Sequence, residues 1–166
     1  MIVLRLIHIF GGVFWVGASF LVVGYVAPSV QAAGDAGRAF MSQFAVKSSF
    51  SIAMAVTGTL TMLSGILMYW EIFGFRADAL ESGQAVALTI GGLAGILALI
   101  LGFAFQFRSI RIMKGITKEI GASGGPPTPE QQAEMGHQAE RIALGGRIGV
   151  VLMTIALIGM ATAQYV

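Results

Sequence analysis

The chain has 166 residues, of which 56% are hydrophobic and 11% are charged, and its formal net charge is +2. Soluble domains carry about 25% charged residues, so this composition excludes an ordinary soluble domain and predicts an integral membrane protein. The chain has no cysteine, which excludes disulfides, thiolate metal sites, c-type haem attachment and iron–sulfur clusters.

Four apolar runs contain no charged residue, and each is long enough to cross a membrane: Leu6–Gly34, Ser48–Trp70, Ser82–Phe107 and Ile148–Val166. About 20 apolar residues in a helix span the hydrocarbon core of a bilayer. We therefore predict an all-α integral membrane protein with a single membrane domain, residues 1–166. Its fold is a four-transmembrane-helix bundle, with helices at about 2–28, 48–73, 84–107 and 141–165.

The first apolar run contains His8, one of only two histidines in the chain. An ionisable side chain in lipid is costly and marks a candidate functional site. On a helix, Gly11, Gly12 and Trp15 share the face of His8, and Arg5 lies one turn before it. We expect a metal-ligating imidazole beside a flat glycine shelf. This combination suits haem b, with Trp15 packed against the macrocycle and Arg5 near the propionates.

The first run also has features of a signal peptide, because Arg5 precedes an apolar stretch. It is about twice as long as a signal h-region, so we expect it to remain as a helix. The connection that follows, residues 28–47, begins at Pro28, which we expect to end the helix. Within this connection, Ala33–Gly37 predicts a turn and Arg38–Phe44 predicts a short interfacial helix.

The basic residues of the connections are divided unevenly between the two sides of the membrane. Only Arg5 and Arg76 lie on one side. On the other side lie Arg38, Lys47, Arg108, Arg111, Lys114, Lys118, Arg141 and Arg147. The positive-inside rule places this larger group in the cytoplasm of a bacterial inner (plasma) membrane, so both termini face outside and His8 lies near the outer surface. Because the positions of these basic residues are explained by the orientation of the helices in the membrane, we expect no nucleic-acid partner.

The third connection predicts a helical hairpin outside the membrane. The third helix continues past its apolar run to about Gly121, where a Gly- and Pro-rich segment ends it. Residues 128–131, Thr-Pro-Glu-Gln, then have the pattern of an N-cap, a first-turn proline and a capping box. A helix from there to about Gln164 is too long to lie wholly in lipid. We therefore expect a cytoplasmic helical hairpin over about residues 108–140.

Small residues at spacings of four or seven predict close contacts between helices, since apolar burial alone drives little association in lipid. These pairs are Gly17 and Gly24, Gly91 and Gly95, and Gly145 and Gly149. Such stripes serve equally for contacts within the chain, in a homo-oligomer or with other membrane subunits. The expected partners are therefore the lipid bilayer and a second copy or another membrane subunit.

The spacing His8-x6-Trp15-x-Gly17 resembles a motif at the start of the first helix in several bacterial four-helix membrane families. These include the copper resistance protein D family, its uncharacterised relatives and the membrane-embedded protoporphyrinogen oxidase that binds haem b. The resemblance covers the first helix, and otherwise only helix number and size. It implies that His8 is a haem ligand. The oxidase-like members also have a functional lysine in the third helix, which residues 82–107 lack, so we do not extend the resemblance to oxidase activity.

A haem at His8 is either five-coordinate or has a second ligand. Met68 and Met160 lie near the predicted depth of His8 and would supply a thioether, although methionine also fills gaps in helix packing. A second His8 across a dimer interface is another option. His137 is excluded within a monomer, because it lies at the opposite membrane surface. The Glu-x-x-His-x-x-Glu stripe around His137 has no matching set for a dimetal site, so we interpret it as a solvated face.

The sequence leaves three functions open. The first is electron transfer by a haem b-binding small cytochrome or subunit of a membrane redox complex, with quinone or an extracytoplasmic electron carrier as redox partner. The second is copper handling, with Cu(I) held by His8 and Met68 or Met160. The third is a non-catalytic accessory or assembly subunit, for which the glycine stripes and the cytoplasmic hairpin would be the contact surfaces. His8 would then be a neutral histidine that forms a hydrogen bond with a neighbouring helix or extends toward the outer headgroups. The sequence contains no nucleophile triad and no Walker loop, and we assign no catalytic residue.

Overall fold

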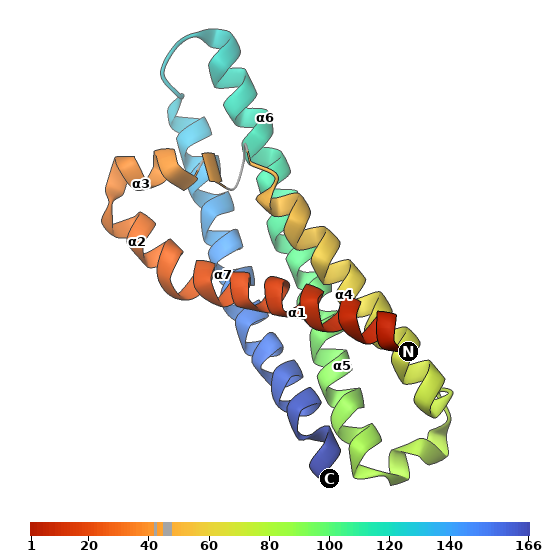
Figure 1. Ribbon diagram of the computed structural model, residues 1–166. Coiled ribbons are helices and arrows are strands. Elements are labelled where there is room, and N and C mark those ends of the chain that lie inside the picture. Colours follow the sequence, from red (N-terminus) through yellow and green to blue (C-terminus); the bar gives the residue numbers. More distant parts are fainter. Residues whose placement is uncertain (42, 45–47) are drawn as a thin grey trace.

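The computed structural model describes residues 1–41, 43–44 and 48–166, and nearly all of them are helical. Four of the described helices are long and apolar enough to cross a membrane: Ile2–Ala32, Phe50–Phe73, Gly83–Ser123 and Pro129–Tyr165. They form an elongated molecule with a helical hairpin at one end (Figure 1). The prediction of an all-α fold with four helices long and apolar enough to cross a membrane is confirmed for the described residues.

The first long helix continues past Pro28. It consists of α1 (Ile2–Leu21), a π-helical turn (Val22–Val26) and α2 (Ala27–Ala32). Proline lacks an amide hydrogen but is tolerated in the first turn of a helical segment. Here Pro28 follows the wider π-helical turn, where the ordinary amide-to-carbonyl pattern is already interrupted. The prediction that Pro28 ends the helix is therefore wrong, because a local change of helix type accommodates the proline.

A tight turn at Ala33 and Gly34 follows the first long helix, whereas the rest of the turn predicted over Ala33–Gly37 is helical in the structure. Gly34 adopts a φ of +57°, which glycine reaches without strain, and α3 (Gly34–Met41) folds back against α2. A Cβ atom on Gly37 would overlap the carbonyl oxygen of Val30. Only glycine therefore fits where α3 meets α2.

The predicted interfacial helix at residues 38–44 overlaps α3. The rings of Phe40 and Phe44 stack with centroids 5.6 Å apart, as their spacing of four predicts for one helix face. Residues 42 and 45–47 lie outside the described residues, and Lys47 of the topology prediction is among them.

The second long helix, α4 (Phe50–Phe73), ends at Gly74, whose φ of +61° closes the helix in a left-handed C-cap. A short 3₁₀ helix (Ala77–Glu81) leads from α4 to the third long helix. The side chain of Ser82 caps this third helix by accepting a hydrogen bond from a backbone amide at 3.2 Å. The connection is thus short and well capped at both ends.

The third long helix has three parts: α5 (Gly83–Leu101), a π-helical turn (Gly102–Phe107) and α6 (Arg108–Ser123). The fourth, α7 (Pro129–Thr162), runs back along it. The Thr128 side chain accepts from the Gln131 amide at 3.3 Å, and the Gln131 side chain accepts from the Thr128 amide at 3.1 Å. The capping box and the helical hairpin of α6 and α7 are therefore formed as the sequence predicts.

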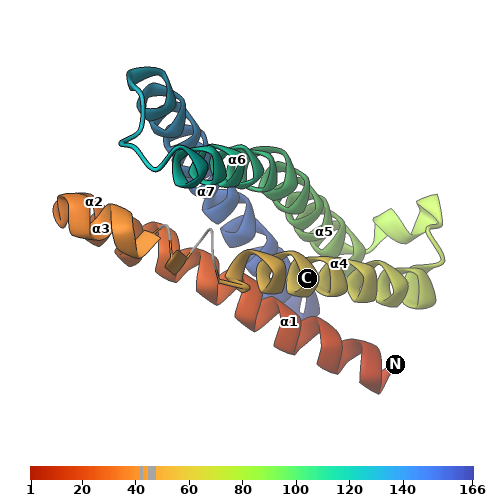
Figure 2. The same cartoon turned by 90° about the horizontal axis from the view of Figure 1, so that it is seen from above.

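The long helices pack as two antiparallel pairs. α1 lies against α4, and α5 with α6 lies against α7 (Figures 1 and 2). The pairs meet at a small core with one residue from each long helix: Trp15, Met62, Ala98 and Met153. The first long helix is the least buried of the four, so much of α1 faces the surroundings of the protein.

The close approach of α5 and α7 depends on glycine. A Cβ atom on Gly159 would lie 2.7 Å from the carbonyl oxygen of Ala87, and a Cβ atom on Gly91 would lie 3.1 Å from the carbonyl oxygen of Ala156. Both obstacles are backbone atoms, which cannot turn away as a side chain can. The two helices therefore touch backbone to backbone, as small-residue contacts in lipid allow.

The predicted small-residue stripes divide into two sets. In one set, an added Cβ atom would contact another helix of this chain: Gly91, Gly95 and Gly145. In the other set, an added Cβ atom would meet no neighbouring atom within 4 Å: Gly17, Gly24 and Gly149. The first set is used for packing within the chain. In the second set, Gly17 and Gly24 are exposed and leave helix surface open, whereas Gly149 is buried.

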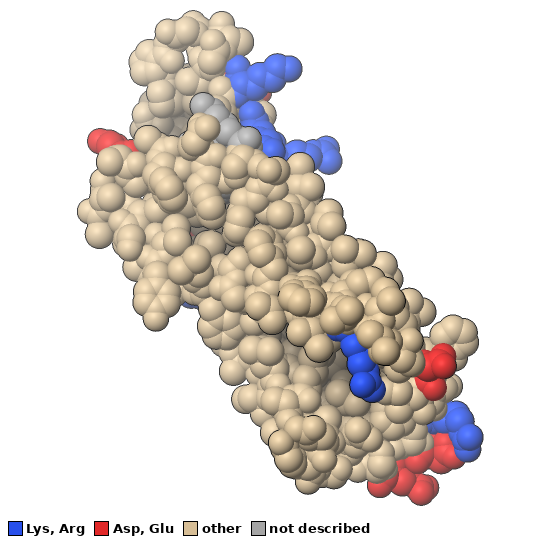
Figure 3. Space-filling model, in the orientation of Figure 1, with Lys and Arg blue, Asp and Glu red and all other residues tan. Residues whose placement is uncertain are grey.

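Charged side chains gather toward the two ends of the molecule and leave a broad, largely uncharged region between them (Figure 3). One end carries the α6–α7 turn, and the other carries the α4–α5 connection and the C-terminus (Figure 1). Both termini lie toward the end opposite the α6–α7 turn. An uncharged belt between two charged ends is the expected surface of a membrane-spanning protein.

One hydrogen bond links α4 and α5 inside the apolar region. The Tyr69 hydroxyl lies 2.7 Å from Oγ1 of Thr89, which itself donates to the carbonyl of Ala85 at 2.7 Å, so Tyr69 is the donor. Such bonds average about 0.6 kcal/mol in membrane proteins. We expect Tyr69→Phe to lower the free energy of unfolding in an SDS titration by about that amount, and Tyr25→Phe, an exposed control, to leave it unchanged. A loss well above about 1.7 kcal/mol would contradict this role.

Candidate functional site at His8

His8 lies on α1, half-buried, and faces α4. Its Nδ1 atom lies 2.8 Å from the backbone carbonyl oxygen of Thr61. Because a carbonyl oxygen only accepts, Nδ1 holds the hydrogen and donates it. In the neutral imidazole, Nε2 then has the free lone pair. The hydrogen bond therefore fixes the ring and leaves the nitrogen that can bind a metal ion.

The imidazole ring of His8 rests on Gly65 of α4. A Cβ atom on Gly65 would lie 2.9 Å from Cε1, 3.1 Å from Nδ1 and 4.0 Å from Nε2 of the ring. The first distance is shorter than real Cβ atoms show, and the second is a tight contact in which the ring would have to move slightly. Gly65 thus forms a recess that no other residue provides, and Nε2 is the ring nitrogen farther from it.

The same pairing repeats seven residues away. Trp15 of α1 lies against Gly58 of α4, where a Cβ atom would lie 2.9 Å from Cε2 and 3.0 Å from Nε1 of the indole. The two rings are seven residues apart on α1, and the two glycines are seven residues apart on α4. Because the helices are antiparallel, each ring meets one glycine recess. This match is a physical reason for the spacing between His8 and Trp15.

Gly11 and Gly12 do not form an open shelf. A Cβ atom on Gly11 would lie 2.6 Å from Oγ1 of Thr61 and 3.3 Å from the carbonyl oxygen of Thr57. On Gly12 it would lie 3.5 Å from Cγ2 of Thr61. The expectation of a bare surface beside His8 is wrong, because α4 occupies that space. Gly11 instead lets α1 come close enough to α4 for the His8 hydrogen bond.

Trp15 belongs to the core of the protein. Its side chain is only 6% exposed and packs with Met62, Ala98 and Met153. We expected Trp15 to pack against a macrocycle, but protein side chains and Gly58 surround the ring. Its aromatic surface is therefore already covered, and Trp15 holds the two helix pairs together.

The remaining predicted residues lie in different places. Arg5 is exposed, one turn before the histidine, and forms no salt bridge with the described residues. Met68 lies one turn beyond Gly65 on α4 and is half-buried. Met160 lies on α7 beside α5, where a Cβ atom on Gly91 would be 3.5 Å from its amide nitrogen. Arg5 and Met68 are thus on the two helices of the site, and Met160 is on the other pair.

Sequence reasoning did not identify the α4 residues of the site. The carbonyl of Thr61 accepts from His8 and also from Oγ of Ser64 at 3.0 Å, while Oγ1 of Thr61 donates to the carbonyl of Thr57 at 2.8 Å. A backbone carbonyl has no sequence signature, so this partner was not predictable. The shared spacing of seven between two rings on α1 and two glycines on α4 is the signal that was present.

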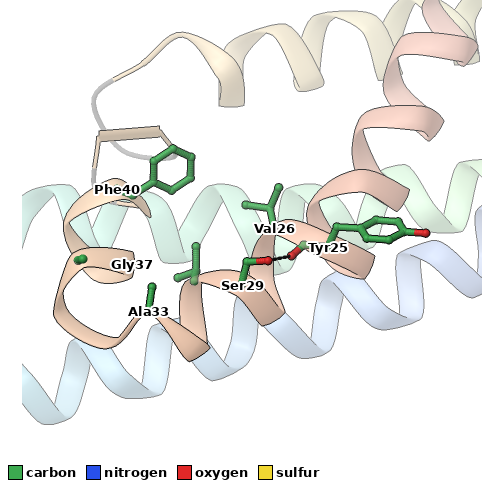
Figure 4. A pocket seen from close by; sticks show the side chains of 8 residues that line it. Tyr25, Val26, Ser29, Ala33, Gly37 and Phe40 are labelled. Carbon is green, nitrogen blue, oxygen red and sulfur yellow. Dashed lines mark hydrogen bonds between the residues drawn. The ribbon is translucent and has the colours of Figure 1, made fainter.

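A cavity of about 390 Å³ lies between α2 and α3, away from His8 (Figure 4). Its lining is mostly apolar and has no charged side chain. The hydroxyl of Ser29 in this lining donates to the carbonyl of Tyr25 at 2.7 Å. The cavity offers neither an imidazole nor a carboxylate, and we assign no chemistry to it.

The second histidine lies on the hairpin. Glu134, His137 and Glu140 are all exposed on α7, and Glu134 accepts a hydrogen bond from Gln138 at 2.6 Å. In the part of the chain that the structure describes, no group of three or more His, Cys, Asp or Glu side chains is placed to hold a metal ion. The candidate site therefore rests on His8 alone.

The resemblance of the first helix to four-helix haem and copper families rests on His8, Trp15 and Gly17. In the structure the two rings fill recesses in α4, and Gly17 is exposed. These positions give the motif a packing role whether or not a cofactor binds. Comparisons with protein-family models, curated proteins and solved structures found no match for this chain.

Proposed function

We propose that this chain is a membrane redox protein that binds haem b through Nε2 of His8 and takes part in electron transfer, as a small cytochrome or a subunit of a membrane redox complex. The hydrogen bond from Nδ1 to the carbonyl of Thr61, at 2.8 Å, supports the proposal. Metal-binding histidines usually donate their other ring hydrogen to a carbonyl or carboxylate, which orients the ring and raises its basicity.

The residues around His8 fit a haem in part. Arg5, exposed and without an ion-pair partner among the described residues, would bind a propionate. Met68 is the candidate for a second axial ligand from α4. Gly11 and Gly65 are covered and would not cradle the macrocycle. A bound haem would supply one-electron transfer, and the protein would contribute the oriented imidazole, its partial burial and the nearby positive charge.

The basic residues support the orientation that we propose for the membrane. Most of them lie toward the hairpin end, which the positive-inside rule places in the cytoplasm of a bacterial inner membrane. His8 would then lie near the outer face. The redox partner would be an extracytoplasmic electron carrier or a quinone that enters from the lipid.

Copper handling is the second candidate. It is favoured by the place of Met68, one helical turn from the glycine that supports the imidazole. A thioether and an imidazole nitrogen are suitable ligands for Cu(I). This proposal needs the same Nε2 atom of His8 but no macrocycle, so metal content separates it from the haem proposal.

An accessory or assembly role is the third candidate. It is favoured by α1, the least buried of the long helices, whose outward face exposes large apolar side chains: Ile2, Leu6, Ile9, Phe10 and Val13. A second copy of the chain or another membrane subunit would cover this face. In this case His8 would serve only to join α1 to α4.

The test is the absorption spectrum of the full chain, purified in detergent, before and after reduction with dithionite. We expect a Soret band and a sharp α band that are lost in His8→Ala and in His8→Gln. The glutamine side chain keeps a hydrogen-bond donor for the Thr61 carbonyl but has no imidazole. His137→Ala, which removes the exposed histidine, is the matched control and should retain the bands.

Other results select another function. Colourless protein with about one copper per chain, lost in His8→Ala but not in His137→Ala, would replace the haem proposal with copper handling. Colourless, metal-free protein that co-purifies with larger membrane subunits would support the accessory role. Bands that persist in both His8 variants would show that the haem ligand is another residue.

A further inference from the structure

The outer face of α6 is basic. Arg108, Arg111, Lys114 and Lys118 are all exposed and recur at intervals of three or four residues, which places them on one side of the helix. The opposite side of α6 contains the buried Ser109 and Ile116 and faces α7. We call the four basic residues the α6 basic face.

The charge of the α6 basic face is not neutralised by ion pairs. The salt bridges among the described residues join Arg38 to Asp35 and Arg76 to Asp78. The acidic residue on α6, Glu119, instead accepts a hydrogen bond from Gln131 across the hairpin at 3.4 Å. The four cations therefore form an exposed positive surface.

This surface continues directly into the membrane-spanning part of the same helix. The rings of Phe103 and Phe107 contact each other in a tilted arrangement, with centroids 5.3 Å apart, and the two residues are 42% and 41% exposed. Phe107, Arg111, Lys114 and Lys118 follow at positions i, i+4, i+7 and i+11, so the aromatic pair lies below the cations on the same stripe. One helix stripe therefore passes from exposed apolar rings directly to exposed cations.

We propose that the α6 basic face binds the headgroups of anionic phospholipids. The aromatic pair would contact the acyl chains, and the cations would contact the phosphates. At about 1.5 Å rise per residue, Arg111 stands only about 6 Å above Phe107, within the headgroup layer, while Lys118 stands about 16 Å above it. Lys114 and Lys118 would therefore act mainly through the screened field, whose range is about 8 Å at physiological salt.

Because the four cations stand at different heights above the aromatic pair, the inner pair, Arg108 and Arg111, and the outer pair, Lys114 and Lys118, should contribute unequally to binding. A lipid headgroup would depend more on Arg108 and Arg111 than on Lys114 and Lys118. A soluble acidic protein would depend at least as much on the outer pair, which extends farther from the membrane. Whichever pair causes the larger loss of binding when it is neutralised therefore distinguishes a lipid headgroup from an acidic protein.

The experiment is native mass spectrometry of the full chain in detergent, titrated with phosphatidylglycerol or phosphatidylcholine. We expect the unmodified chain to bind phosphatidylglycerol more tightly than phosphatidylcholine. In R108Q/R111Q, the affinity for phosphatidylglycerol should fall by about fivefold or more for each of the two charges removed. K114Q/K118Q should cause a smaller loss. Both double variants change the formal net charge from +2 to 0, as does the control R38Q/R76Q, in which both arginines already pair with aspartate. The control should bind like the unmodified chain.

Three results would overturn the proposal. They are equal affinity for the two lipids, an R108Q/R111Q variant that binds phosphatidylglycerol like the control, and a larger loss in K114Q/K118Q than in R108Q/R111Q. Circular dichroism of each variant checks that the helices remain folded. The outcome is independent of haem binding, because His8 lies on another helix pair.

Discussion

Gly159→Leu is expected to separate α5 from α7 and to lower the free energy of unfolding by about 3 kcal/mol, the largest stability change that we predict. The first atom of the new side chain would lie 2.7 Å from the carbonyl oxygen of Ala87 and 3.1 Å from Cα of Gly91. These are backbone atoms, so α5 itself must move. SDS titration or thermal unfolding in detergent measures the loss.

Gly92→Leu is the matched control, because a Cβ atom at Gly92 would meet no neighbouring atom within 4 Å. Both substitutions replace a helical glycine, so both gain the same helix propensity. The control should therefore not be destabilised, and helix propensity alone would raise its free energy of unfolding by at most about 0.8 kcal/mol. Equal destabilisation of the two variants would show that the α5–α7 contact does not depend on the backbone approach at Gly159.

Gly65→Ala is expected to have the largest effect on the candidate site. The new methyl group would lie 2.9 Å from Cε1 and 3.1 Å from Nδ1 of His8, so the imidazole must shift, and we expect its hydrogen bond to Thr61 to weaken or break. Loss of such an orienting partner typically weakens metal binding by about 10- to 100-fold. Haem titration of the purified chain, followed at the Soret band, measures the change.

A second measurement tests the geometry without a cofactor. In ¹⁵N NMR of histidine-labelled protein, His8 should be in the Nδ1–H form at neutral pH, and Gly65→Ala should shift it toward the other tautomer. Gly12→Ala is the control, because its Cβ atom would make an ordinary contact at 3.5 Å from Thr61. An unchanged His8 signal in Gly65→Ala would refute the role of the recess.

Local sequence predicted the helices well because the signals are local. A run of uncharged residues fixes a span, and the Thr128–Gln131 capping box fixes the start of α7. The exception was Pro28. A proline usually ends a helix, but a change to π-helical bonding just before Pro28 lets the helix continue. No simple residue pattern predicts that change of helix type.

The site was predictable only in part. The sequence identified His8 because a histidine in an apolar run is unusual, and it identified Gly11 because a glycine lets a macrocycle approach the backbone. It did not show that a neighbouring helix would approach instead. The structure places Thr61 of α4 against Gly11 and leaves no shelf, and it adds a backbone carbonyl as the partner of the imidazole.

The sequence by itself determined four helices of spanning length, the Thr128 cap and the hairpin, because helix length and end signals depend on neighbouring residues alone. Only the tertiary structure decided that α1 pairs with α4, that Gly58 and Gly65 receive Trp15 and His8, and that Met160 belongs to the other helix pair. The physical reason is that apolar helix faces are nearly equivalent in lipid. Steric fit between large rings and glycine recesses, which involves residues far apart in the chain, selects the partners.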